Sequence, residues 1–221
     1  MSALTLIIGN RNYSSWSLRP WALLTHLGLP FDEILIELDT PTFATQIRQH
    51  SPNGKVPALR DGDLVVCESI AIMEYACELA GGRGWPAERP IRAEARSVAS
   101  EMHAGFSALR QSCPMNIRAR GRRVTSSPAL AADIARIDAV WSSCRERHAA
   151  RGPWLFGEYS AADAMYLPVA FRFQSYGADG LGTRAREYMA TALADPVIAP
   201  WIRAAEAETQ RLPSEETGAT P

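Results

Sequence analysis

The fold of this chain is constrained most by a change of pattern near residue 81. Before that point, short apolar runs typical of strands alternate with helical patterns, and after it no run predicts a strand. Two β-type runs within 56–69 flank Asp61-Gly62-Asp63, which favours a hairpin turn. Further strands are expected at 4–9 and 31–38, with helices at 16–28 and 69–82 and a weaker helix or loop at 40–50. The order β-α-β-α-β-β-α predicts a mixed four-stranded sheet with helices on its faces.

The second half of the chain is expected to be all-helical. Glycine and proline mark a linker at 82–90, which separates a first domain, 1–81, from an all-α domain, 91–212. The helical patterns cover 91–112, 128–150, 160–175, 181–193 and 196–210. Ser160, followed by Asp163, has the spacing of a capping box. The polar end, 213–221, predicts a flexible tail.

Composition argues against several classes of function. The net charge of −1 provides no strong field to attract nucleic acid or anionic lipid. The chain has no apolar run long enough to predict a spanning helix, and it does not begin like a signal peptide. We therefore expect a cytoplasmic protein without a membrane or nucleic-acid partner. The cysteines have no metal-site spacing, so they are expected to be structural and no metal is expected; they are Cys67, Cys77, Cys113 and Cys144.

The segment NRNYSSWSLRPW, residues 10–21, joins the first predicted strand to the first predicted helix and carries several hydroxyl groups. The N-terminus of a helix is the positive end of its dipole and favours an anion such as a carboxylate, a phosphate or a thiolate. A serine at this position can cap the helix or donate its hydroxyl to a bound anion. From this segment alone, both interpretations stay open.

Two further segments allow either a structural or a binding role. Pro57 precedes a predicted strand, and the Val56–Pro57 bond is either an ordinary trans bond or a cis bond. The cis form would leave the Val56 backbone free to pair with an extended, peptide-like ligand. Glu68 and Ser69 open a predicted helix, where they either cap it or hold the ammonium and carboxylate of an amino-acid end.

Taken together, these segments resemble the cytosolic glutathione transferase family. The resemblance covers nearly the whole chain and is carried by YSSWSLRPW, NGKVPAL, the ES pair and the SAAD capping box. It implies a thioredoxin-like first domain followed by the all-helical domain. SSWSLR is similar to the S-S-C-S-x-R pattern of the zeta class, which includes maleylacetoacetate isomerases. Trp16 stands where that pattern has cysteine, and Trp21 where it usually has a second arginine.

The resemblance implies a glutathione site of the serine type. Ser14 takes the position of the catalytic serine, whose hydroxyl would donate to the glutathione sulfur and favour the thiolate. Tyr13 is the alternative donor, and Ser15 or Ser17 is expected to cap the helix. Val56 would pair with the cysteinyl backbone of glutathione, Glu68 and Ser69 would hold the γ-glutamyl end, and Lys55 would reach the glycine carboxylate. The full set of expected glutathione-binding residues is Ser15, Trp16, Lys55, Val56, Pro57, Glu68 and Ser69.

A pocket for the second substrate is expected between the domains. Its wall is predicted from one helix and consists of Met102, His103, Phe106 and Arg110. The spacing of Met102 and Phe106 equally fits core residues. The arginines of 118–123 either lie in a solvated loop or attract an anionic substrate.

The function implied by the resemblance is a glutathione transferase. It would activate the thiol for attack on a small, largely apolar electrophile, as in detoxification, with glutathione as co-substrate. Two alternatives stay open, a glutathione-dependent cis-trans isomerase of the maleylacetoacetate type and a non-enzymatic binding module of the same fold. The resemblance also implies a homodimer.

Overall fold

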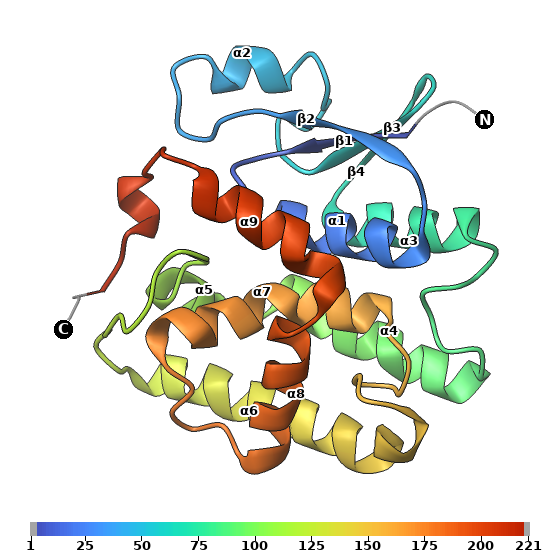
Figure 1. Cartoon of the computed structure of the whole chain (residues 1–221), viewed down its shortest axis with the longest axis vertical. Coiled ribbons are helices and arrows are strands. Elements are labelled where there is room, and N and C mark those ends of the chain that lie inside the picture. The colour runs from blue at the N-terminus through green and yellow to red at the C-terminus, as the bar shows by residue number, and fades with distance from the viewer. Residues whose placement is uncertain (1–3, 219–221) are drawn as a thin grey trace.

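The structure, a computed structural model, describes residues 4–218 (Figure 1). The first domain contains a four-stranded sheet of order β2-β1-β3-β4. Its strands are β1 (Leu4–Ile8), β2 (Phe31–Leu35), β3 (Ala58–Asp61) and β4 (Leu64–Cys67). β2 is parallel to β1, whereas β1–β3 and β3–β4 are antiparallel pairs, so the sheet is mixed as predicted. Residues 1–3 and 219–221 of the predicted first domain and tail lie outside the described residues.

Helices cover both faces of this sheet. Helices α1 (Ser15–Leu27) and α3 (Ser69–Leu79) pack together on one face, and the short α2 (Phe43–Ile47) lies on the other (Figure 1). Because side chains alternate along a strand, β1 contributes to two cores. Leu6 belongs to the main core, whereas Ile7 packs in a smaller cluster with Ile47 of α2. This arrangement explains why β1 is apolar at nearly every position.

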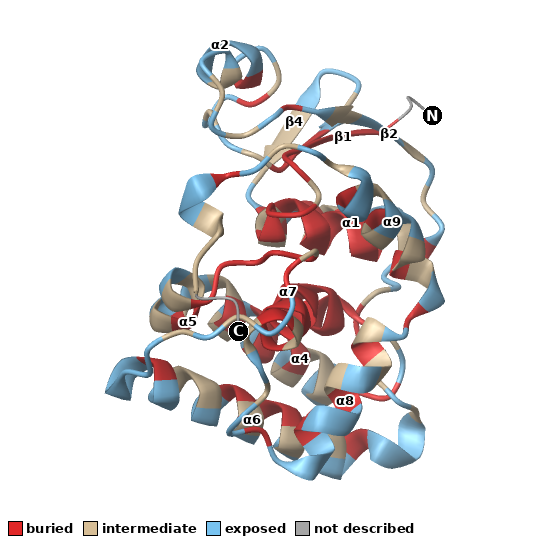
Figure 2. Cartoon of the chain, turned by 60° about the vertical axis from the view of Figure 1, so that its left-hand side comes forward, coloured by how far each residue is buried: buried red, intermediate tan, exposed pale blue. Residues whose placement is uncertain are grey.

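The rest of the chain is helical, as predicted. The elements are α4 (Arg89–Ala104), α5 (Ser107–Ser112), α6 (Pro128–His148), α7 (Ala161–Tyr176), α8 (Thr183–Leu193) and α9 (Ala199–Ala207), with short 3-10 turns at Ala149–Arg151, Pro196–Ile198 and Pro213–Glu215. Helix α7 lies at the centre and is buried over almost its whole length (Figure 2). It packs against α1, which joins the helical domain to the first domain.

The capping box at the start of α7 is confirmed. The Asp163 carboxylate accepts hydrogen bonds of 2.9 Å from both the backbone N–H and the hydroxyl of Ser160. Its other oxygen accepts the backbone N–H of Leu155, also at 2.9 Å. One buried carboxylate therefore fixes the start of the central helix together with the loop that precedes it.

Two parts of the second half differ from the predictions. The helix expected over 91–112 is two helices, because Phe106 adopts a left-handed conformation with φ of 62° and reverses the chain after Gly105. The end of the chain, expected to be flexible from 213, is bound to the body of the protein as far as 218. We call residues 208–218 the C-terminal segment.

Polar side chains anchor the C-terminal segment, which explains how a polar sequence is held in place. The Glu208 carboxylate accepts the backbone N–H groups of Arg11 and Asn12 at 2.6 and 3.0 Å. Glu216 accepts a hydrogen bond of 2.7 Å from Tyr13 and forms an ion pair of 2.5 Å with Arg122. The segment therefore lies against the turn that carries Ser14.

Candidate functional site

The serine turn lies between β1 and α1. The backbone N–H of Ser14 donates to the carbonyl of Asn10 at 2.8 Å, which closes the turn before α1 begins at Ser15. Ser14 is the N-cap residue, and its hydroxyl accepts the backbone N–H of Ser17 at 3.4 Å. The positive end of α1 therefore lies beside the Ser14 hydroxyl.

The prediction that Ser15 or Ser17 caps α1 is wrong, because Ser14 is the cap. The Ser17 hydroxyl is fully buried and accepts the backbone N–H of Gly9 at 3.1 Å. It also shares a hydrogen bond of 2.7 Å with the Ser14 hydroxyl. Ser14 therefore both caps α1 and lines a cavity, whereas the sequence interpretation had assigned the cap to a different serine.

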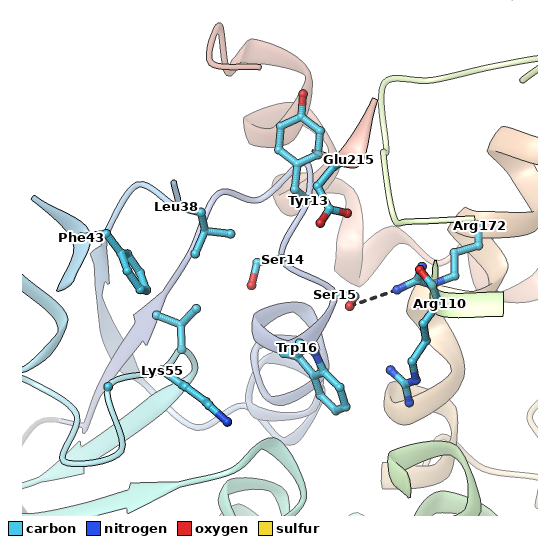
Figure 3. A pocket seen from close by; sticks show the side chains of 12 residues that line it. Tyr13, Ser14, Ser15, Trp16, Leu38, Phe43, Lys55, Arg110, Arg172 and Glu215 are labelled. Atoms are coloured by element: carbon cyan, nitrogen blue, oxygen red, sulfur yellow. Dashed lines mark hydrogen bonds between the residues drawn. The ribbon is translucent and has the colours of Figure 1, made fainter. Parts of the chain in front are cut away.

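Tyr13 is turned away from the Ser14 hydroxyl, as Figure 3 shows. Its hydroxyl donates to Glu216 at 2.7 Å and accepts a hydrogen bond of 2.9 Å from Arg118. Burial and the bond to Glu216 raise the pKa of Tyr13. Both hydrogen-bonding directions of this hydroxyl are therefore used in holding the C-terminal segment.

Two cavities adjoin at the serine turn. The larger has a volume of about 390 Å³ and the smaller about 180 Å³, and both are lined by Trp16, Lys55 and Val56. The larger cavity is also lined by Tyr13, Ser14, Ser15, Leu38, Phe43, Gly54, Arg110, Arg172 and Glu215 (Figure 3). The smaller is completed by Asn53, Pro57, Glu68 and Ser69. Of the residues predicted to bind glutathione, every one lines at least one of these cavities.

Glu68 and Ser69 do not cap α3, which is the structural role considered for them. Glu68 occupies the N-cap position, but its side chain makes no capping bond. It has a φ of 69°, a left-handed conformation that is unfavourable for glutamate and found often at functional sites. The Ser69 hydroxyl is buried and has no hydrogen-bond partner within residues 4–218. The smaller cavity is therefore lined by the Glu68 carboxylate, which accepts one hydrogen bond of 3.4 Å from the Asn53 side chain, next to an unsatisfied hydroxyl donor.

The Val56–Pro57 peptide bond is cis. It directly precedes β3, at the edge of both cavities. Lys55 is exposed on the same turn, and its backbone N–H donates to the side chain of Asn53 at 3.0 Å.

Trp16 separates the two cavities and is surrounded by basic side chains. The guanidinium carbons of Arg19 and Arg110 lie 4.1 and 4.6 Å from the centre of its ring. His103 meets the ring edge-on, with ring centres 5.5 Å apart. Burial and the nearby Arg19 lower the pKa of His103.

The four residues predicted to form the second-substrate wall divide into two groups. Arg110 lines the larger cavity, and His103 contacts its Trp16. Met102 is fully buried in the main core, and Phe106 is buried against Tyr166. Neither Met102 nor Phe106 lines either cavity, because both are buried in the main core, so we leave both out of the candidate pocket.

Sequence interpretation missed several residues of the larger cavity. Arg172 lies on the apolar helix α7, where a lone arginine among buried residues was a signal that could have been used. Its guanidinium donates to the Ser15 hydroxyl at 3.3 Å and to the carbonyl of Cys113. Glu215 was assigned to a flexible tail, so its place in the cavity could not be anticipated. Leu38 lies in the connection after β2, and Phe43 is the first residue of α2.

The arginines of 118–123 have mainly structural contacts. Arg118 donates to Tyr13 and to the carbonyls of Glu208 and Gln210, while Arg122 pairs with Glu216. Arg120 is exposed and donates to the carbonyls of Ile117 and Ala119. None of these arginines lines the two cavities, so the proposed attraction of an anionic substrate receives no support from their position.

The cysteines lie outside the serine turn. Burial raises the pKa of Cys113 to about 11 and that of Cys77 and Cys144 to about 12. Such thiols are poor nucleophiles. Within residues 4–218 the acidic, histidine and cysteine side chains form no group of three that could hold a metal ion, and no helix there is long and apolar enough to cross a membrane.

Comparison with known proteins places this geometry in a family context. Residues 13–79 match the model of the glutathione S-transferase N-terminal domain, which spans the serine turn, Val56–Pro57 and Glu68–Ser69. None of the curated proteins matches the chain significantly. The structural similarities, however, extend over both domains.

Solved structures of glutathione transferases resemble the whole chain. A glutathione transferase homolog from Burkholderia BGR1, with bound glutathione, aligns with a TM-score of 0.71 over 93% of this chain and 99% of its own, at 20% identity. A glutathione S-transferase from Xylella fastidiosa aligns with a TM-score of 0.66 over 92% of this chain and 98% of its own, at 22% identity. A Tau class glutathione S-transferase from mango aligns with a TM-score of 0.71 over 92% of this chain and 96% of its own, at 16% identity.

The chain has the glutathione S-transferase fold. The family model matches the first domain, and the structural similarity covers both domains. In this fold, the two cavities lie beside the serine turn, Val56–Pro57 and Glu68–Ser69.

Proposed function

We propose that this chain is a glutathione transferase in which Ser14 activates the glutathione thiol for attack on a small electrophile. One observation carries the proposal: the residues expected at the thiol and at the γ-glutamyl end of glutathione line adjoining cavities that share Trp16, Lys55 and Val56. Glutathione lying across both cavities would place its thiol beside Ser14 and its γ-glutamyl end beside Glu68 and Ser69.

At the thiol end, Ser14 has the position and chemistry of a hydrogen-bond donor. A free thiol has a pKa of about 8.5, so only a small part is ionised at neutral pH. The Ser14 hydroxyl and the N-terminus of α1 both favour the thiolate. The Ser17 hydroxyl can accept from Gly9 and still donate to Ser14, which leaves the Ser14 proton free for sulfur.

At the γ-glutamyl end, Glu68 and Ser69 match the two charges of an amino acid. The Glu68 carboxylate would pair with the ammonium group, and the unsatisfied Ser69 hydroxyl would donate to the carboxylate. The N-terminus of α3 adds favourable backbone dipoles for the same carboxylate. Lys55 is placed to meet the glycine carboxylate, and Val56 to pair with the cysteinyl backbone.

The electrophile would occupy the larger cavity. Its volume of about 390 Å³ falls in the range of small-molecule sites. Leu38, Phe43 and Trp16 provide apolar walls, and Arg110 and Arg172 provide positive charge. This wall replaces the one expected from Met102 and Phe106.

Glutathione titration followed by an assay with an activated aryl chloride tests the proposal. Quenching of Trp16 fluorescence would report binding, because this ring borders both cavities. Binding with conjugate formation supports a transferase. Binding with turnover of a cis-alkene acid and no loss of glutathione indicates the isomerase, and binding without either reaction indicates a binding module. An absence of binding at millimolar glutathione overturns the proposal. Sedimentation would check the homodimer that the family resemblance implies, and cell fractionation the cytoplasmic location.

A further inference from the structure

We propose that Arg19, Arg110 and Arg172 form a cationic cluster that stabilises the glutathione thiolate together with the Ser14 hydroxyl. The inference rests on the proposed function, because the cluster acts on the thiol of the ligand assigned there. We call these three residues the arginine cluster. They come from α1, α5 and α7, so the helical domain would contribute directly to thiol activation.

Arg19 and Arg172 are buried and Arg110 is half-buried, and their nearest acidic groups, Asp133 and Glu215, act on Arg110 and Arg172 without forming an ion pair. Arg19 is fully buried; its Nε donates to the carbonyl of Met165 at 3.1 Å, and both terminal nitrogens have no hydrogen-bond partner within residues 4–218. Arg172 is 5% exposed and donates only to uncharged oxygens, the Ser15 hydroxyl and the carbonyls of Cys113 and Arg110. Over the described residues, no member of the cluster forms an ion pair. A buried charge without a counter-ion is unfavourable, so an anion at this site would be bound strongly.

The cluster converges on the two residues that follow Ser14. Arg172 binds the Ser15 hydroxyl, and the guanidinium groups of Arg19 and Arg110 lie against the ring of Trp16. Contact with an aromatic ring offsets only part of the cost of burying a cation. Burial lowers the pKa of Arg19, and the charges of Arg110 and Arg172 lower it further, which shows how closely these like charges are held.

Other charged and titratable groups lie around the arginine cluster and affect the electrostatic potential there. Burial lowers the pKa of Arg110, and this shift is opposed in part by Asp133 of α6, which accepts the backbone N–H of Leu109 at 2.9 Å. Tyr166 of α7 and His103 of α4 face the cluster from the helical domain. Lys55 and Glu68 face Trp16 from the first domain. Among the described residues lining the larger cavity, Glu215 carries the one carboxyl group.

These charges predict opposite effects for two variants in the same cavity. A full charge at about 8 Å in a partly buried site shifts a neighbouring pKa by about one unit. Loss of the Arg110 charge should therefore raise the pKa of the bound thiol, and loss of the Glu215 charge should lower it. A merely structural role for either residue would produce no such pair of opposite shifts.

Ultraviolet absorbance of the thiolate during pH titration of the glutathione complex measures these shifts. Arg110→Gln should raise the thiol pKa by about one unit, Arg110→Lys by a few tenths at most, and Glu215→Gln should lower it by about half a unit. Arg120→Gln removes an exposed arginine outside both cavities and is the matched control, with no shift expected. Retained glutathione binding with an unchanged thiol pKa in Arg110→Gln overturns the inference and leaves the proposed function standing. Failure of the unmutated chain to bind glutathione overturns both.

Ser14→Ala provides a second measurement if Arg110→Gln does not fold. With the hydroxyl gone, the arginine cluster should still hold the pKa of bound glutathione below that of free glutathione titrated in parallel. Addition of salt should change this difference little, because buried charges are poorly screened. A bound thiol that titrates like the free one in Ser14→Ala overturns the inference.

Discussion

Replacing Ser14 by alanine should separate its two roles, because each has its own magnitude and its own measurement. As the N-cap of α1, its hydroxyl accepts the Ser17 backbone N–H over a long 3.4 Å. Loss of an N-cap costs about 0.5–2 kcal/mol, and this distance favours the lower half of that range. As the proposed thiol donor, Ser14 contributes one hydrogen bond, whose loss would cost about 1 kcal/mol of preference for the thiolate. That preference corresponds to a rise of nearly one unit in the thiol pKa, and to a fall in kcat/KM of up to about tenfold at neutral pH.

The assay combines thermal unfolding, glutathione titration and pH profiles of kcat/KM for Ser14→Ala beside Ser17→Ala. Ser17 is the comparison variant, because its hydroxyl contacts that of Ser14 but does not line either cavity. Both variants should lose stability, whereas Ser14→Ala should shift the pH profile upward by more than Ser17→Ala, which removes only a group that orients the donor; glutathione affinity should stay within a few-fold of the original. Equal losses of turnover with identical pH profiles would refute the reasoning, since Ser14 would then be structural. Unchanged turnover in Ser14→Ala would move the donor role to Tyr13 or Ser15.

Further predictions concern other parts of the site and the central helix. Tyr13→Phe should leave the thiol pKa unchanged but loosen the C-terminal segment, because the Tyr13 hydroxyl is bound to Glu216 and Arg118. Limited proteolysis would measure the loosening and the pH profile of kcat/KM the thiol pKa. A shifted pH profile would favour a tyrosine mechanism. Ser69→Ala and Glu68→Ala should each weaken glutathione binding about tenfold or more, the loss expected for a charge-assisted bond, with little effect on folding, since neither side chain caps α3. Unchanged affinity in calorimetry would show that the tripeptide lies elsewhere. Burial raises the pKa of Asp163 from 3.8 to about 6, so the folded chain holds this proton more tightly than the unfolded chain. The free energy of unfolding should therefore fall as pH rises from about 4 to about 6, by an amount on the order of 3 kcal/mol, and Asp163→Asn should flatten this slope in denaturant titrations.

The sequence predicted the sheet of the first domain well, because its signals are local. Asp61-Gly62-Asp63 specifies the hairpin between β3 and β4, and the unbroken apolar run of β1 reflects a strand buried on both faces. The division of the predicted helix 91–112 into α4 and α5 at Gly105 and Phe106 was missed for a physical reason. The residues on either side have good helix patterns, and Phe106 takes a left-handed conformation that its side chain does not favour, so packing in the helical domain decides the turn.

The same contrast applies to the candidate site. Val56, Glu68 and Ser69 lie in short motifs whose spacing can be recognised in a sequence. Arg172 and Glu215 reach the cavity only because α7 packs on α1 and because the C-terminal segment returns to the serine turn. Both residues are far from Ser14 in sequence, so no local motif links them to it. The arginine in the apolar helix α7 was a signal for Arg172, whereas Glu215 lies in a polar stretch and gave none.

The capping role of Ser14 and its proposed thiol-donating role support one another rather than compete. A cap fixes the hydroxyl at the positive end of α1, and the buried Ser17 hydroxyl holds its orientation from behind. A donor that is already oriented loses little conformational freedom when the thiol arrives, so more of the hydrogen bond is available to stabilise the thiolate. Arg172 would also help to hold the serine turn in place, because its hydrogen bond to the Ser15 hydroxyl ties the turn to the central helix of the other domain. The stability of α1 and the ionisation of the ligand would thus depend on the same hydroxyl, and a serine at this position serves both better than a residue that could perform only one of the two roles.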